Sequence, residues 1–240
     1  MPGYRTKQES IAIRGAADLV IRSLLDRQQF SDPQGEAERA GISSATWPLF
    51  GLLWPSGAHL AAHMAEHLLR PGERILEMGC GLALASLVAH RRGADVTASD
   101  CHPLAGPFLA ANLQLNGMTP LKYRHGEWAL PLTASPPSAS GSGSVQGRYD
   151  LLMGSDVLYD RDASVALAGF IGRHACAAAE VWIVDPDRGN RPRFSALMAE
   201  AGFGLVQTRL DQAANPEGPG YKGRLLTYRR LAKGVDAAAG

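Results

Sequence analysis

Short apolar segments alternate with helical patterns along most of the chain, and most apolar segments end in polar residues. The strand-like segments are residues 74–77, 96–99, 123–128, 149–155 and 181–185, and the segments with helical spacing of apolar residues are 56–69, 82–90, 103–116, 163–178 and 194–201. Residues 203–210 and 223–231 are two further strand-like segments, which we expect to pair antiparallel. Strands that alternate with helices in this way predict an α/β protein with a doubly wound sheet.

The N-terminal part of the chain carries a different pattern. Apolar residues at helical spacing between residues 11 and 29 predict an amphipathic helix, which the turn-forming residues 32–35 bring to an end. Residues 36–42 are expected to form a loop or a short helix. We therefore assign residues 1–45 to an N-terminal helical extension that packs on the core or shapes a substrate entrance.

The rest of the chain fits one domain of ordinary size, since the sequence has 240 residues and 45% of them are hydrophobic. We assign this domain to residues 46–231. Within it, residues 133–147 are rich in serine, glycine and proline and are expected to form a flexible loop insertion. Residues 232–240 are expected to be a disordered tail.

Charge and composition exclude several classes of protein. The formal net charge is +1, so no long-range field attracts nucleic acid, and we expect no stable nucleic-acid partner. Cys80, Cys101 and Cys176 are odd in number and widely spaced, which supports neither a disulfide framework nor a zinc ribbon. No apolar run approaches the roughly 18 residues that a membrane span needs, and no signal-like segment is visible. We expect a cytoplasmic protein with no membrane partner, and the sequence leaves its oligomeric state open.

One strand–helix–strand segment has the glycine turn and closing acid of a nucleotide-binding crossover. Gly79 and Gly81 allow a sharp turn close to a ligand, and Asp100, at the end of the second strand, can accept two hydrogen bonds from a ribose diol. A dinucleotide site has a third glycine where this chain has Leu84, which argues against NAD. Glu77, two residues before the first glycine, can pair with an ammonium group, which S-adenosylmethionine has and NAD lacks.

The pattern Glu77-x-Gly79-x-Gly81, with an acid closing the next strand, resembles the cofactor site of seven-strand S-adenosylmethionine-dependent methyltransferases. Ala83 stands where that family often has a third glycine. The resemblance implies a Rossmann-like, doubly wound sheet of seven strands with the last strand antiparallel. It also implies S-adenosylmethionine as the cofactor.

Two further motifs resemble one branch of these enzymes, the lysine methyltransferases of methyltransferase family 16. Trp54 lies in Leu-Trp-Pro-Ser before a predicted helix, and Asp156 and Tyr159 form an Asp-x-x-Tyr motif at the end of a strand. The resemblance implies that Trp54 lines the cofactor pocket and that Asp156 and Tyr159 face the methyl group. Asp156 is expected both to contact the cofactor and to orient the acceptor amine. Glu127 and Trp128 match the acidic residue and tryptophan that contact adenine in the family.

These motifs predict transfer of a methyl group to a lysine side chain of an acceptor protein. A small-molecule N- or O-methyltransferase is one alternative, because the cofactor half of the fold does not define the acceptor. A non-catalytic module that binds a nucleotide or a partner is a second alternative. The intact acids Glu77, Asp100 and Asp156 argue against that module.

Two other clusters of charged or ligating residues have simpler interpretations. The helix predicted at 56–69 contains His63-x-x-Glu66-His67, which matches a zinc peptidase pattern and places two imidazoles one turn apart. Three fixed residues often match by chance, and we therefore predict no metal site. The loop at 185–193 holds three arginines, and both a patch for an acidic substrate and a solvated turn before the next helix remain open.

Overall fold

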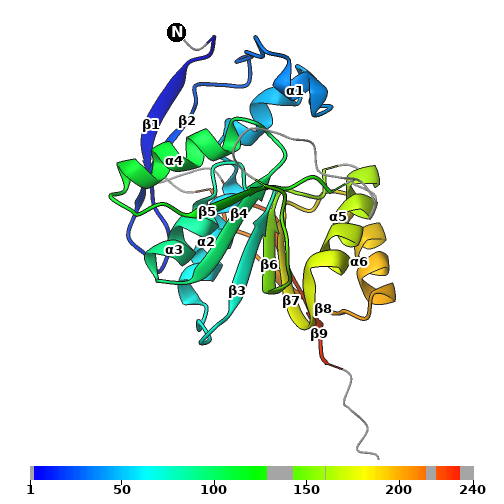
Figure 1. Ribbon diagram of the computed structural model, residues 1–240. Helices are drawn as coiled ribbons and strands as arrows, with labels where there is room; N and C mark the ends of the chain where they lie inside the picture. The colour runs from blue at the N-terminus through cyan, green and yellow to red at the C-terminus, as the bar shows by residue number, and fades with distance from the viewer. Residues whose placement is uncertain (1–2, 129–142, 160, 215–219, 233–240) are drawn as a thin grey trace, which may run out of the picture.

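The computed structural model describes residues 3–128, 143–159, 161–214 and 220–232, and Figure 1 shows one sheet with helices on both faces and a small hairpin beside it. The elements are β1 (Thr6–Ile11), β2 (Leu19–Leu24), α1 (Glu36–Arg39), the 3₁₀ helix η1 (Trp47–Gly51), α2 (Pro55–Glu66), β3 (Arg74–Met78), α3 (Leu84–Arg91), β4 (Asp95–Asp100), α4 (Ala105–Leu115), β5 (Lys122–His125), β6 (Tyr149–Ser155), α5 (Arg161–His174), β7 (Ala175–Asp185), α6 (Arg191–Glu200), β8 (Gly204–Arg209) and β9 (Arg224–Arg230).

The main sheet has seven strands in the order β5-β4-β3-β6-β7-β9-β8. Strands β3 to β7 run parallel to one another, whereas β9 lies between β7 and β8 and is antiparallel to both. The predicted doubly wound sheet and its antiparallel last strand are therefore confirmed. The chain proceeds from β3 toward β5 on one side and resumes at β6 on the other. The carboxyl ends of β3 and β6 thus form the switch point at which open α/β sheets bind ligands.

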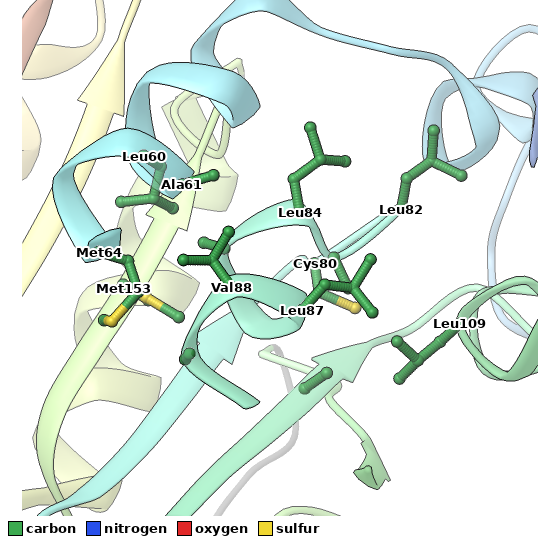
Figure 2. Close-up of a cluster of buried hydrophobic side chains, with 14 of the residues drawn as sticks. Leu60, Ala61, Met64, Cys80, Leu82, Leu84, Leu87, Val88, Leu109 and Met153 are labelled. Carbon is green, nitrogen blue, oxygen red and sulfur yellow. The ribbon is translucent and has the colours of Figure 1, made fainter. Parts of the chain in front are cut away.

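Helices cover both faces of the sheet, which explains why its central strands are apolar along most of their length. Helices α2, α3 and α4 pack on one face, and α5 and α6 pack on the other. On the first face, the buried side chains of Leu60 and Met64 from α2 gather with Val88 of α3 and Met153 of β6 (Figure 2). These contacts fix the strand ends that carry the polar residues.

The helix predicted between residues 11 and 29 is wrong, because β1 and β2 form an antiparallel hairpin there. In β2, Leu19 and Ile21 are fully buried whereas Val20 between them is exposed, so the side chains alternate as in a strand. Gly15, with a φ of 81°, lies in the connection between the two strands. The isoleucine, valine and leucine residues of this short segment fit both the two-residue period of a strand and the three- to four-residue spacing of a helix. The turn between the two halves of the segment favours the strands. The short helix expected within residues 36–42 is present as α1.

Two asparagines, one in α4 and one directly after it, bind the free edge of this hairpin. Asn116 accepts a hydrogen bond from the Val20 N–H at 2.9 Å and donates one to the Val20 carbonyl at 2.8 Å. Asn112, one turn earlier, accepts from the Arg22 N–H at 2.8 Å and donates to its carbonyl at 3.4 Å. An edge strand presents unpaired backbone groups, and these two amides satisfy those of β2 in place of another strand.

We expect Asn112→Ala to lower the free energy of unfolding by about 1–3 kcal/mol, because it leaves backbone groups of Arg22 without their partner in a buried contact. For a domain of this size the loss corresponds to roughly 2–10 °C in Tm. Urea denaturation and thermal unfolding measure it. Gln114→Ala, at an exposed position of the same helix, is the control and should change stability by less than about 0.5 kcal/mol. Equal stabilities of the two variants would contradict the role given to Asn112.

Several boundaries differ from the sequence prediction. The strand predicted at 123–128 ends at His125, so Glu127 and Trp128 follow β5 instead of belonging to it. The helix predicted at 163–178 ends at His174, and Ala175 already pairs with Tyr149 of β6. In both cases pairing in the sheet overrides the local preference of the sequence.

The predicted loop insertion at 133–147 is only partly visible, because residues 133–142 lie outside the described residues, as do residues 233–240 of the predicted tail. At the described end of the segment, Ser144 forms a bridge with His125, and Val145 is buried. This end therefore packs against the edge of the sheet. None of the helices described here is long and apolar enough to cross a membrane.

Candidate active site

A cavity of about 650 Å³ opens at the carboxyl ends of β3, β4 and β6. All nine residues predicted to form the site line this cavity, namely Trp54, Glu77, Gly79, Gly81, Asp100, Glu127, Trp128, Asp156 and Tyr159. Residues 40–42, after α1, also line it, so the N-terminal extension forms part of the cavity wall. The structure thus brings together side chains from five separate regions of the sequence.

The glycine turn after β3 approaches its neighbours closely. Gly79 and Gly81 have left-handed φ angles of 59° and 51°. A Cβ on Gly79 would lie 3.1 Å from the Trp128 ring, and a Cβ on Gly81 would lie 2.8 Å from the Phe50 carbonyl oxygen of η1. Ala83, with a φ of 59°, adopts the left-handed conformation that a glycine would accept more readily, and α3 begins directly after it.

We expect Gly81→Ala to destabilise the fold by about 2–4 kcal/mol, because the new methyl group adds left-handed strain and a clash with backbone that cannot rotate away. Gly117→Ala is the matched control, since Gly117 has a φ of 63° and no atom within 4 Å of the added Cβ. It should cost only the strain, about 1 kcal/mol. Urea denaturation of both variants isolates the clash, and equal losses would mean that η1 moves to accommodate the methyl group.

Glu77, near the end of β3, directs its carboxylate to the first turn of α3. The residue is 3% exposed, and Oε2 accepts a hydrogen bond from the backbone N–H of Ser86 at 2.8 Å. Burial raises the pKa of Glu77 to about 7, and the nearby charge of Asp100 adds to this effect. A cationic group beside Glu77 would favour its ionised form.

Asp100 is held at the glycine turn by two backbone hydrogen bonds. Its Oδ2 accepts from the Gly81 N–H at 2.9 Å, and its Oδ1 accepts from the His102 N–H at 2.8 Å. Burial raises the pKa of this carboxyl above its usual value. Each carboxylate oxygen has a further lone pair, so the fixed group can still accept hydrogen bonds from a ligand diol.

Asp156 occupies a strained backbone position directly after β6. Its φ is 58°, and its N–H donates to the Val184 carbonyl of β7 at 3.0 Å. Oδ1 lies 2.9 Å from Nη2 of Arg188, and Oδ2 is buried and accepts no hydrogen bond within the described part of the chain. Burial raises the pKa of Asp156. Non-glycine residues with a left-handed φ, such as Asp156, cluster at functional sites. Tyr159, three residues further on, is 57% exposed and lines the same cavity.

The two tryptophans form apolar parts of the wall. The indole Nε1 of Trp54 donates to the Leu49 carbonyl at 2.9 Å, and the guanidinium of Arg27 lies 5.0 Å from the ring centre. The Nε1 of Trp128 is buried without a hydrogen-bond partner among the described residues. Glu127 lines the cavity next to it.

Three further residues of this region belong to none of the motifs found in the sequence. Phe50 and His102 both line the cavity, and their rings stack with centres 3.7 Å apart. Burial lowers the pKa of His102 to about 3, so this ring is neutral. Asp185, at the end of β7, is fully buried with neither oxygen hydrogen-bonded among the described residues, and burial raises its pKa to about 6. Its place at a strand end, like that of Asp100, was a signal that could have identified it.

The histidines of α2 make ordinary contacts. His67 lies 2.8 Å from Oε2 of Glu73, and the ring of His63 packs against Trp182 with centres 4.3 Å apart. Over the described residues, no group of three potential ligands is arranged to hold a metal ion.

The fold and the glycine turn define a class, the Rossmann-like methyltransferases. A methyltransferase from Pyrococcus furiosus superposes with a TM-score of 0.52 and 17% identity, covering 70% of this chain and 81% of the other. Magnesium protoporphyrin IX methyltransferase from Synechocystis, in complex with S-adenosylmethionine, superposes with a TM-score of 0.54 and 17% identity, covering 73% and 78%. At this identity the likeness establishes the fold.

The family model described as lysine methyltransferase matches residues 48–191, more than half of the chain, and the protein belongs to that family. It is 26% identical to the electron transfer flavoprotein beta subunit lysine methyltransferase of Mus musculus over 76% of this chain and 67% of the relative. It is 33% identical to protein N-lysine methyltransferase METTL21A of Danio rerio over 54% of each chain. For the flavoprotein-modifying relatives the chain spans 51–67% of their length.

The predicted family and S-adenosylmethionine as its cofactor are thereby confirmed. The residues around the cavity also fit this cofactor chemically. The buried carboxylates of Glu77 and Asp100 match an ammonium group and a ribose diol, and both glycines of the turn line the same cavity. Trp54 and Trp128 supply apolar surface for a base and a sulfonium.

Proposed function

We propose that this protein transfers the methyl group of S-adenosylmethionine to a lysine side chain of an acceptor protein. The observation that carries the proposal is the position of Asp156 and Tyr159, which line the cavity formed by Glu77, Asp100 and the glycine turn. Membership of the lysine methyltransferase family supports it. The names of the relatives support a protein acceptor, since they are described as modifying lysines of proteins.

When bound, S-adenosylmethionine supplies an electrophilic methyl group, and the residues of the chain prepare the amine. At pH 7 the loss of a proton from a lysine of ordinary pKa costs about 4.6 kcal/mol. Transfer of the side chain from water into the cavity lowers that pKa, because it disfavours the charged form. We propose that Asp156 then accepts an N–H of the amine and directs its lone pair, while Tyr159 forms the wall of the slot.

The other predicted residues are proposed to hold the cofactor. Glu77 pairs with the ammonium group, Asp100 binds the ribose, and Glu127 and Trp128 contact the adenine. Trp54 packs beside the same pocket, and the turn at Gly79 and Gly81 admits the ligand. Asp156 lies where these residues meet the acceptor, so we propose that it contacts the cofactor as well as the amine, whereas Tyr159 contacts the acceptor.

Methyl-labelled S-adenosylmethionine tests the proposed function. The protein is incubated with cell lysate and, separately, with purified electron transfer flavoprotein beta subunit, the acceptor named for the relatives. We expect label on a protein band and, after digestion, methyl groups on lysine. Label only in the small-molecule extract would support a small-molecule methyltransferase instead. Cofactor binding without any label would favour a non-catalytic module.

A further inference from the structure

The carboxylate of Asp156 is already occupied by a cation from its own chain. Nη2 of Arg188 lies 2.9 Å from Oδ1, and Nη1 donates to the main-chain carbonyl of Asp156 at 3.3 Å. The Asp156 side chain is 11% exposed, whereas that of Arg188 is 34% exposed, so the guanidinium is the outer partner. Since Oδ2 is buried as well, an amine that enters the cavity meets the arginine before it meets a free carboxylate oxygen.

The guanidinium of Arg188 bonds to Asp156 and, among the described residues, not to the loop that carries it. Within the described part of the chain, both of its hydrogen bonds go to Asp156. A separate ion-pair network lies nearby, in which Arg191, Arg209 and Arg224 all pair with Asp187. Arg188 is not part of this network, so its guanidinium can leave Asp156 without breaking those ion pairs.

Charge balance decides which group can replace the Arg188 guanidinium beside Asp156. Removal of one partner from a largely buried ion pair leaves an uncompensated charge and is strongly unfavourable. A lysine ammonium carries the same charge as the guanidinium, so the exchange of one for the other keeps the site balanced. A neutral or acidic side chain offers no such exchange, because it would leave the carboxylate of Asp156 without a cation.

We propose that Arg188 is a specificity-determining residue, which occupies the acceptor's position on Asp156 until a cationic side chain displaces it. The inference rests on the proposed function and adds the selection step to it. The primary ammonium of lysine carries the charge that replaces the guanidinium. Once it has given one proton to bulk water, it still has an N–H for Asp156 to accept. Arg188 therefore competes with the correct acceptor and keeps neutral side chains out.

The test uses the full chain saturated with S-adenosylhomocysteine and titrated with N-acetyl-lysine amide, with N-acetyl-norleucine amide as the neutral probe. We expect Arg188→Met to bind the lysine amide five- to tenfold more tightly than the wild type, and added methylguanidine to reverse this gain. Arg188→Lys should resemble the wild type. Arg193→Met, at an exposed arginine of α6, is the control and should not change the affinity. Weaker or unchanged binding to Arg188→Met overturns the proposal and makes Arg188 a clamp for Asp156.

A second measurement is made on the wild type itself, and a variant serves only to assign the signal. In the wild type labelled with ¹⁵N-arginine, the Arg188 Nε–H resonance, assigned with Arg188→Lys, should shift and exchange faster with water when the lysine amide is added. The norleucine amide should leave it unchanged. An unchanged resonance at saturating lysine amide overturns displacement even if lysine methylation is found. Failure of the wild type to bind the lysine amide and to label lysines would reject the proposed function as well.

Discussion

Asp156→Asn is expected to lower kcat for lysine methylation by about 100- to 1000-fold while S-adenosylhomocysteine still binds. The asparagine side chain keeps the shape of aspartate, but it lacks the charge that attracts the ammonium and strengthens the hydrogen bond to the amine. Loss of one charged hydrogen-bonding group that acts on the reacting atoms typically costs this much. Initial rates with the labelled acceptor and calorimetric titration of the cofactor product measure the two effects separately.

The control for this variant is Asp95→Asn, an acid at the start of β4 whose side chain is 46% exposed and pairs with Lys122 at the surface. It should retain the wild-type kcat and cofactor affinity, because exposed pairs contribute little. Full turnover by Asp156→Asn would exclude the carboxylate from the reaction. A parallel loss of cofactor binding would instead make Asp156 a cofactor ligand.

The central sheet was predictable because its strands obey simple rules. β3, β4, β6 and β7 are largely buried, and the apolar residues of β3, β6 and β7 show this in the sequence. The short β4 is recognised instead by its place between two helical segments and by the acid that ends it. The N-terminal hairpin was not predictable in the same way. Its pairing depends on the turn at Gly15 and on Asn112 and Asn116, which lie at least 90 residues away at the end of α4. No local pattern reports such a contact.

The candidate site shows the same division. The acids at strand ends could be found from the sequence, since parallel strands deliver their carboxyl ends to one edge of the sheet. Phe50 could not, because its position depends on a cluster in which Trp47, Phe108 and His102 pack against its ring. Arg188 was visible as one of three arginines in a loop, but only the structure distinguishes the one that pairs with Asp156.

Glu77→Gln is expected to weaken S-adenosylhomocysteine binding by about 30- to 100-fold at pH 7.5 and, at the same pH, to stabilise the free protein. The affinity falls because the ammonium group loses a buried charged partner. The stability rises because the pKa of Glu77, about 7 in the fold, exceeds its ordinary value of 4.5. The carboxyl thus opposes folding increasingly as the pH rises from about 4.5 through 7. Removal of this penalty should add about 1–3 kcal/mol, or roughly 2–10 °C in Tm.

The pH dependence of S-adenosylhomocysteine binding, compared between the wild type and Glu77→Gln, provides the control. In the wild type, the dissociation constant should rise about tenfold between pH 7.5 and pH 6, because protonation of Glu77 removes the charge that binds the ammonium. In Glu77→Gln the affinity should be low and nearly independent of pH over this range. Calorimetric titrations at several pH values and thermal unfolding without ligand measure both effects. A variant that binds weakly and is also less stable would mean that Glu77 is ionised and well satisfied before the cofactor arrives. The combination of weaker binding and greater stability has one explanation, a carboxylate buried at a cost to folding so that it can meet a cationic ligand.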